Sequence, residues 1–198
     1  MPSVIIDMSP SLDGYVAGSD ITVERPFGEV GLRLHRWIGF DGAVPSPDDE
    51  AMAGRMFDGA GAVVVGRRMF EVGIGTWGPD GAFERPTFVV TSRPQPPLER
   101  GRTTFTFVTD GVEAALAAAR AAAGDRDVVV AGGADVAEQC LATGQVDELR
   151  LHLIPVLLGG GTRLFARGLP ASIELRLTQQ VATQHALHCT YRVERRSG

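Results

Sequence analysis

The fold class is most visible in Val128-Val129-Val130-Ala131-Gly132-Gly133-Ala134-Asp135. A continuous run of β-branched residues is typical of a strand that is covered on both faces, as in a parallel sheet. Two glycines follow directly, and glycine lets a ligand approach the backbone between a strand and the next helix. The segment is not a GxGxxG fingerprint, so the double glycine is weak evidence by itself.

Two further buried strands end in polar residues that suit phosphate. One is Val63-Val64-Val65-Gly66-Arg67-Arg68-Met69-Phe70-Glu71, in which arginine offers bidentate contacts to phosphate at a helix start. The other is Phe88-Val89-Val90-Thr91-Ser92-Arg93-Pro94, whose hydroxyls and arginine suit the 2′-phosphate of NADP. Either segment alone is more typical of an ordinary turn or polar loop. Because ligands of an open α/β sheet lie beyond the carboxyl ends of its strands, the three segments together predict a dinucleotide site.

The remaining pattern predicts one α/β domain over residues 1–198, since a domain averages about 150 residues. Toward the C-terminus, apolar and polar residues alternate in a way that is typical of antiparallel strands. We therefore expect a mostly parallel sheet with antiparallel strands at the C-terminal end. The expected parallel strands are 4–8, 62–65, 87–91, 104–109 and 127–131, the helices 47–57, 110–124 and 135–143, and the antiparallel strands 149–154, 173–178 and 187–193.

Composition excludes several function classes. The net charge of 19 − 24 = −5 argues against a general nucleic-acid binder, which normally carries a basic excess. The chain contains no lysine, which excludes Schiff-base lysine chemistry and a P-loop lysine. With no leader pattern and no apolar run near about 18 residues, we expect a cytoplasmic protein outside the membrane. His185, His188 and Cys189 alternate along a strand without a fourth ligand, and Cys140 and Cys189 form no CxxC pair, so we expect no metal site.

Two more motifs flank these segments. Ser11-Leu12-Asp13-Gly14 precedes them, and Ile154-Pro155-Val156-Leu157-Leu158-Gly159-Gly160-Gly161 follows them. In this order and at these spacings the chain resembles the dihydrofolate reductase superfamily over nearly its whole length. It is more similar to the riboflavin-biosynthesis branch, the RibD C-terminal reductase domain of bifunctional deaminase-reductases, although it lacks the deaminase motif. The resemblance implies a three-layer fold, a homodimer, and NADPH-dependent reduction of a C=N bond in a pteridine-like or ribosylaminopyrimidine substrate.

The same resemblance assigns the cofactor contacts. It matches Gly66, Arg67 and Arg68 to the turn that contacts the pyrophosphate, and it admits a cis peptide bond between the two glycines of the 128–135 segment. The other matched residues are Thr91, Ser92 and Arg93 for the 2′-phosphate, Val16, Ala17 and Gly18 near the nicotinamide, and Gly132, Gly133, Ala134 and Asp135 against the cofactor.

A carboxylate is expected beside the substrate, because reduction of a C=N bond also places a proton on nitrogen. Dihydrofolate reductases carry this group on the helix before the Gly-Arg turn. Counting without gaps favours Glu50, and a slip of one residue favours Asp49. Asp13 in the S-L-D-G motif is a third candidate. The helix acids are also typical of solvated first-turn residues that interact with the helix dipole.

Residues 21–45 form the longest stretch without a clear strand pattern, and such loops in compact domains are usually functional. Both ends are tethered near the expected reacting centre, so we expect this segment to form one wall of the substrate pocket, with His35 and Trp37 as contacts. The alternative is that Trp37 packs beneath the loop as a local core. Leu158 and Gly159 are also expected near the substrate.

Two other functions remain open, namely reduction of dihydrofolate itself and nucleotide binding without turnover. A ribose phosphate on the substrate would need cations beyond the cofactor site, and a pterin would need a flat apolar slot. The sequence offers Arg33, Arg36 and Arg163 for a ribose phosphate, and Trp37, Phe40 and Phe57 for a pterin slot. In every case the expected partner is a small molecule.

Overall fold

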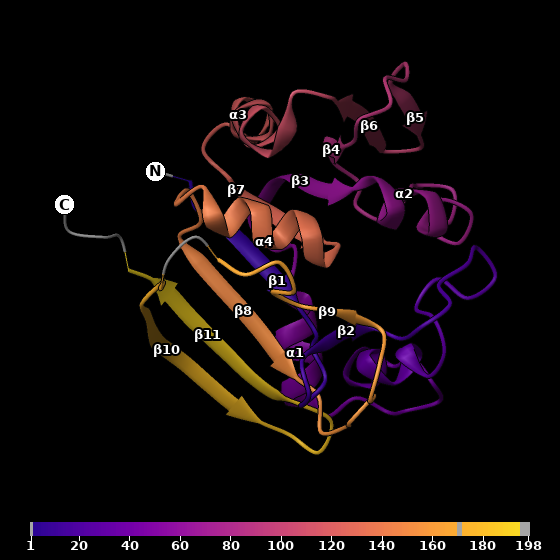
Figure 1. The fold of residues 1–198 in the computed structure, drawn as a ribbon, viewed down its shortest axis with the longest axis vertical. Helices are drawn as coiled ribbons and strands as arrows, with labels where there is room; N and C mark the ends of the chain where they lie inside the picture. Colours follow the sequence, from indigo (N-terminus) through magenta and orange to yellow (C-terminus); the bar gives the residue numbers. More distant parts are fainter. Residues whose placement is uncertain (1, 170–171, 195–198) are drawn as a thin grey trace.

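One twisted sheet organises the computed structural model, which describes residues 2–169 and 172–194 (Figure 1). The strand order within these residues is β10 (Leu175–Ala182), β11 (Leu187–Val193), β8 (Glu148–Leu153), β1 (Val4–Met8), β7 (Asp127–Gly132), β3 (Ala60–Gly66), β4 (Thr87–Val90), β6 (Thr103–Val108) and β5 (Leu98–Arg100).

The central strands from β8 to β6 pair in parallel, and β5, β10 and β11 pair in antiparallel fashion at the two edges. The expected fold class is thereby confirmed. β8 departs from its expectation, because it pairs parallel to β1 and antiparallel to β11. The sheet therefore changes direction after β8 rather than before it.

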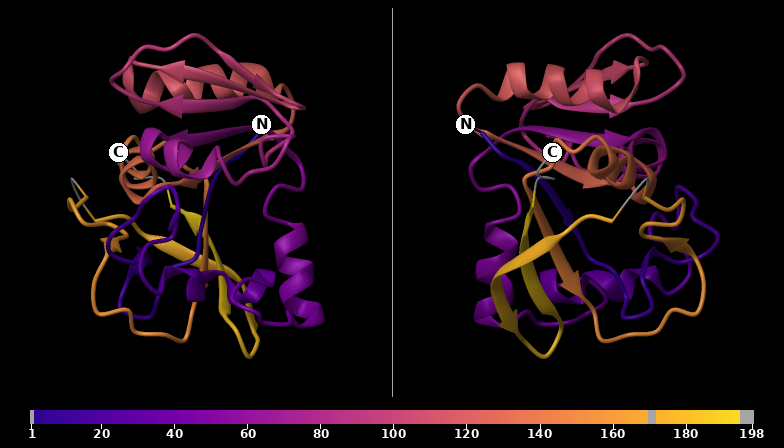
Figure 2. Two further views of the ribbon diagram at one scale, coloured as in Figure 1. Left: turned by 90° about the vertical axis from the view of Figure 1, so that its right-hand side faces the viewer. Right: turned by 60° about the vertical axis from the view of Figure 1, so that its left-hand side comes forward.

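Helices cover both faces of the sheet. One face carries α3 (Gly111–Ala123) and α4 (Ala134–Ala142), and the other carries the 3₁₀ helix η1 (Gly31–Ile38), α1 (Pro47–Gly54) and α2 (Arg67–Gly73). Figure 2 shows α1 and α4 on opposite sides of the strands. Burial on both faces explains why the central strands are continuous apolar runs, with every residue of β1 and β3 buried.

α1 begins where the sequence predicts a helix, and its capping box shows why. The Ser46 hydroxyl accepts a hydrogen bond from the Asp49 backbone N–H at 3.1 Å, and the Asp49 carboxylate accepts one from the Ser46 N–H at 2.9 Å. Pro47 occupies the first turn, where its missing N–H has no cost. This cap places Asp49 under the helix rather than in solvent.

Several elements escaped the sequence prediction because they are very short. β2 (Tyr15–Ala17) and β9 (Thr162–Arg163) pair with each other in a small second sheet beside the main one. Its strands are two or three residues long, too short for a period-2 pattern to be visible. β5 was missed for the same reason.

The packing of α3 on β3 predicts that Gly61→Ala destabilises the protein. A Cβ at Gly61 would lie 2.6 Å from the Ala123 carbonyl oxygen, and overpacking of this kind costs about 1–3 kcal/mol. Gly54→Ala in α1 is the matched control, because a Cβ there meets nothing within 4 Å and alanine favours a helix by about 0.5–1 kcal/mol. Urea unfolding of the two variants measures both effects, and equal midpoints would contradict the prediction.

Candidate active site

A cavity of ≈ 750 Å³ opens at the carboxyl ends of β1, β3, β4 and β7. This is the edge of a parallel sheet at which α/β proteins bind ligands, and the volume suits a dinucleotide fragment with a small substrate. Asp7, Met8 and Ser9 line it from the end of β1, while Phe27 and His35 line it from the segment 21–45.

The cavity wall at β3 and β4 carries the positive charge. The Arg67 guanidinium donates to Glu71 at 2.9 Å and to Gln95 at 3.0 Å, and Arg93 donates to the same Glu71 oxygen at 2.8 Å. Glu71 therefore holds two arginines at this end, and they lower the pKa of its carboxyl group. Arg68 lines the cavity with an exposed guanidinium that makes no hydrogen bond or ion pair within residues 2–169 and 172–194.

The glycine turn adjoins this wall, because β7 pairs with β3. The Gly132–Gly133 peptide is cis, and Gly132 has a φ of 116°, which favours glycine. A Cβ at Gly132 would lie 3.3 Å from the Met8 sulfur, and one at Gly66 would lie 3.1 Å from Val136. Side chains at these positions would thus crowd the wall. α4 begins directly after Gly133 with no side-chain cap, which leaves its first backbone N–H groups to an anionic ligand.

These observations fit a bound NADPH, and most residues assigned to it by resemblance meet at this cavity. The structure brings Val16, Ala17, Gly66, Arg67, Arg68, Thr91, Ser92, Gly133, Ala134 and Asp135 together in its lining. Gly132 lies behind this surface against Met8, and Gly18 lies against the backbone of Glu29. Arg93 reaches the site through Glu71.

The three candidate acids lie in three different environments. Glu50 is exposed on α1, whereas the neighbouring Asp49 is fully buried. Burial raises the pKa of Asp49, but hydrogen bonds from Ser46, Thr183 and His188 more than compensate and lower it. Neither α1 acid is among the described residues that line the cavity.

Asp13 connects its own S-L-D-G motif to the P-x-L-L-G-G motif through hydrogen bonds. Its carboxylate accepts hydrogen bonds from the Ser11 hydroxyl at 2.6 Å and from the N–H groups of Leu158 and Gly159 at 3.1 and 2.8 Å. The Ser11 hydroxyl contributes most to lowering the pKa of Asp13 to about 2. The S-L-D-G and P-x-L-L-G-G motifs are therefore explained by each other, and Leu158 and Gly159 contact Asp13 rather than the cavity.

A fourth carboxylate, Asp7, was missed by sequence reasoning. It lines the cavity at the end of β1 with 5% of its surface exposed, and its Oδ2 atom has no hydrogen-bond partner. Its Oδ1 atom lies 3.1 Å from Nε2 of His152. An acid within the apolar run Val4–Met8 is the signal that could have found it, because buried acids are rare unless they are paired or functional.

His152 and His188 extend this contact into the protein. They are cross-strand neighbours on β8 and β11, and their Nδ1 atoms lie 2.6 Å apart. Nε2 of His188 lies 3.0 Å from the Asp49 carboxylate. Both histidines are 1% exposed, because α1 and η1 cover this face of the sheet.

Trp37 is also placed differently from the expectation. It is fully buried, stacks on His152 with ring centroids 4.0 Å apart, and donates to the Ser9 hydroxyl at 3.0 Å. It is not among the described residues that line the cavity, which corrects its assignment as a substrate contact. The same segment does reach the cavity through Ile21, Pro26, Phe27 and His35.

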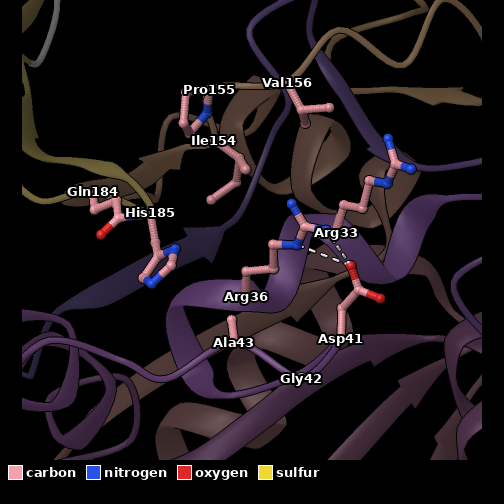
Figure 3. A pocket seen from close by; sticks show the side chains of 10 residues that line it. All are labelled: Arg33, Arg36, Asp41, Gly42, Ala43, Ile154, Pro155, Val156, Gln184 and His185. Carbon is pink, nitrogen blue, oxygen red and sulfur yellow. Dashed lines mark hydrogen bonds and ion pairs between the residues drawn. The ribbon is translucent and has the colours of Figure 1, made fainter.

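A second cavity of ≈ 290 Å³ lies between η1, the loop after β8 and the β10–β11 turn (Figure 3). Arg33 and Arg36 line this smaller cavity rather than the large one, and Arg36 is ion-paired with Asp41 at 2.6 Å. Arg163 lies 4.9 Å from the centre of the Tyr15 ring on the small sheet. The three cations proposed for a substrate phosphate are thus absent from the described lining of the large cavity.

Comparisons with known proteins agree with this architecture. The family model of the RibD C-terminal domain matches residues 2–188. The fold is similar to that of a putative riboflavin biosynthesis protein from Shewanella sp. PV-4, with a TM-score of 0.73 and 21% identity over 98% of this chain and 99% of that one. No curated protein matches the chain.

Two enzyme structures share the fold as well. One is a diaminohydroxyphosphoribosylaminopyrimidine deaminase/5-amino-6-(5-phosphoribosylamino)uracil reductase from Thermotoga maritima, with a TM-score of 0.62 and 13% identity over 97% of this chain and 56% of that one. The other is a dihydrofolate reductase from Enterococcus faecalis complexed with NADP(H), with a TM-score of 0.57 and 16% identity over 96% of each chain. Within the described residues, no helix is long and apolar enough to cross a membrane.

The environment of His35 predicts a loss of stability in mild acid. Its Nδ1 atom is buried without a partner, and burial lowers the pKa of His35 to about 4. The unfolded histidine titrates near about 6.5, so between these values only the unfolded chain binds the proton. The free energy of unfolding therefore falls with falling pH, by up to about 1.4 kcal/mol per pH unit from this group.

His35→Phe should flatten this dependence while it keeps the ring contact with Phe27, which lies at 4.3 Å between centroids. Some slope remains in the variant, because burial also lowers the pKa of His188. Urea unfolding from pH 7 to pH 4.5 measures both proteins. Parallel curves for wild type and variant would show that His35 does not titrate as the cavity geometry implies.

Proposed function

Since this chain belongs to the family of the RibD C-terminal domain, we propose that it is an NADPH-dependent reductase of a C=N bond in a flat heterocycle, either pteridine-like or ribosylaminopyrimidine. The cavity at the carboxyl ends of the parallel strands carries this proposal. Its lining combines a glycine turn, an arginine-rich wall and apolar side chains.

Different residues of the cavity suit different parts of the cofactor. Arg67, Arg68 and the first turn of α4 suit the pyrophosphate, while Ser92 and Arg93 suit the 2′-phosphate. Val16 and Ala17 line the same cavity as Asp7, and the nicotinamide is expected beside them. When bound there, NADPH supplies a hydride. The Asp135 carboxylate, which would repel phosphate, is ion-paired with Arg167 at 2.6 Å.

The substrate end favours a flat ring. Phe27 lies 4.3 Å from the His35 ring and both line the cavity, so the pocket offers aromatic surface without an added cation. Because Arg33, Arg36 and Arg163 lie elsewhere, the lining supports a pteridine-like ring more than a ribosyl phosphate. Reduction of dihydrofolate itself is therefore the second candidate.

Binding of the two reduced nicotinamide cofactors tests the cofactor. Charge-assisted hydrogen bonds contribute about 1.5–3 kcal/mol each, so NADPH should bind at least about tenfold more tightly than NADH, and Arg93→Ala should remove most of that preference. Arg102→Ala, on the β5–β6 turn and ion-paired with Glu84, is the matched control. Nicotinamide fluorescence titrations measure the affinities of all three proteins for both cofactors, and equal affinities in the wild type would refute NADPH dependence.

A panel of C=N substrates then tests the reaction. Dihydrofolate, other dihydropteridines and the ribosylaminopyrimidine substrate of the riboflavin pathway are mixed with NADPH, and absorbance at the reduced-nicotinamide band is followed. We expect turnover of at least one flat heterocycle. Tight NADPH binding without turnover of any of them would favour the alternative of a nucleotide-binding protein.

The proposed assembly is a homodimer, as expected from the resemblance. β10 is an edge strand of the sheet and exposes Leu175 and Leu177, which are 41% and 48% accessible. Sedimentation equilibrium at micromolar concentration should give twice the chain mass of 21.0 kDa. A mass of one chain would contradict the dimer without affecting the proposed reaction.

A further inference from the structure

Asp7, His152, His188 and Asp49 form one buried chain of side chains from the cavity to α1. Its three links measure 3.1, 2.6 and 3.0 Å, from Asp7 Oδ1 to His152 Nε2, between the two Nδ1 atoms, and from His188 Nε2 to Asp49 Oδ1. All four residues are at most 5% exposed. Because they are buried, these polar side chains are expected to satisfy one another.

Asp49, at the α1 end of this series of side chains, determines which atoms donate and which accept along it. The Asp49 carboxylate accepts from the Ser46 N–H at 2.9 Å, from the Ser46 hydroxyl at 2.7 Å and from the Thr183 hydroxyl at 2.8 Å. With these donors it is held as an anion, so Nε2 of His188 must carry a proton and donate it. Burial lowers the pKa of His188, which keeps that ring neutral and leaves its Nδ1 atom as an acceptor.

The donor and acceptor roles of His152 follow from those of His188. Because Nδ1 of His188 accepts, Nδ1 of His152 must donate across the 2.6 Å contact. The last link, 3.1 Å between His152 and Asp7, needs a proton of its own. Three links thus require three protons, whereas two carboxylates and two neutral imidazoles bring only two. One extra proton is held between Asp7 and His152, next to the cavity.

The Asp7 carboxyl group has one oxygen left over. Oδ2 is buried, has no hydrogen-bond partner, and belongs to a residue that lines the cavity together with its chain neighbours Met8 and Ser9. An unpartnered carboxyl oxygen in such a place costs free energy unless a ligand completes it. A nitrogen of a heterocycle seated in the cavity is a group that would complete it.

We propose that Asp7 is the catalytic proton donor of this site and that His152, His188 and Asp49 are positioning residues that keep one transferable proton on it. This inference rests on the reductase function proposed above. In this proposal Asp7 contacts the substrate, whereas Asp49 on α1 acts only through the two histidines.

Reduction of a C=N substrate requires that the shared proton reach the substrate nitrogen. A half-turn about the Asp7 Cβ–Cγ bond brings the shared proton from the His152 side to the cavity side. As the substrate carbon gains hydride, the electron pair of the C=N bond takes this proton, so that an N–H bond forms and the carboxyl O–H bond breaks. The Asp7 carboxylate left behind regains a proton from water after the product leaves.

The decisive variant is Asp7→Asn, because an asparagine N–H can still donate to His152 and keep the chain intact but cannot release a proton. NADPH affinity and the unfolding midpoint should stay within twofold and within 3 °C of wild type. Turnover of the compound that the wild type reduces should fall at least about 100-fold, the range expected for loss of a general acid. Asp127→Asn on the adjacent strand, whose carboxylate accepts from the Ser3 N–H at 2.7 Å, is the matched control.

The proton chain itself is read by nitrogen-15 NMR of the ligand-free protein, which needs no substrate. Protons are expected on Nδ1 of His152 and Nε2 of His188, with Nδ1 of His188 bare. His188→Gln should release the His152 proton to rapid exchange and lower turnover about tenfold without changing NADPH affinity. A merely structural histidine would instead change stability and leave the His152 signal unaltered.

The outcomes separate the two proposals. A wild type that binds no NADPH refutes the reductase function. A wild type that reduces substrate equally well with Asn at position 7 refutes the role of Asp7 alone. A bare Nδ1 on His152 refutes the proton chain, whether or not a substrate is known, because no arrangement of the three links then places the extra proton beside Asp7.

Discussion

Two carboxylates and two imidazoles buried under α1 are the constraint on which the rest of the site depends. Leaving one of these buried polar groups without its hydrogen-bond partner costs about 1–3 kcal/mol. The strands β1, β8 and β11 and the helix α1 must therefore keep their relative positions to within hydrogen-bond distance. The cap that orients Asp49 at the start of α1 and the pairing of His152 with His188 across two strands both serve this requirement.

The same register positions the cavity. β1 pairs with β8 on one side and with β7 on the other, so Asp7 and the glycine turn after β7 are held at one edge of the sheet. Met8 fills the space that a side chain on Gly132 would occupy, with its sulfur 3.3 Å from that position. The buried chain and the cofactor wall thus share β1, and a shift of this strand would disturb both.

The sequence predicted the fold well, because continuous valine runs indicate strands buried on both faces and glycines at strand ends indicate turns before helices. Gly133, Arg67 and Ser92 were found as cavity residues for this reason, since each follows a strand of the parallel sheet. The acid was not found in this way. Asp7 belongs to an apolar run, and only the pairing of β1 with β8 and of β8 with β11 shows that His152 lies beside it and His188 lies next to His152.

The segment 21–45 shows how a single short helix serves both parts of the site. The backbone of η1 is kinked at His35, where φ is −117° and ψ is 16°. In η1, His35 lines the cavity while Trp37 packs on His152 and donates to Ser9, another lining residue. Trp37 thereby excludes water from the buried chain, and hydrogen bonds are stronger in the low dielectric that results. Its contribution to chemistry is made through His152 and Asp7 rather than by contact with substrate.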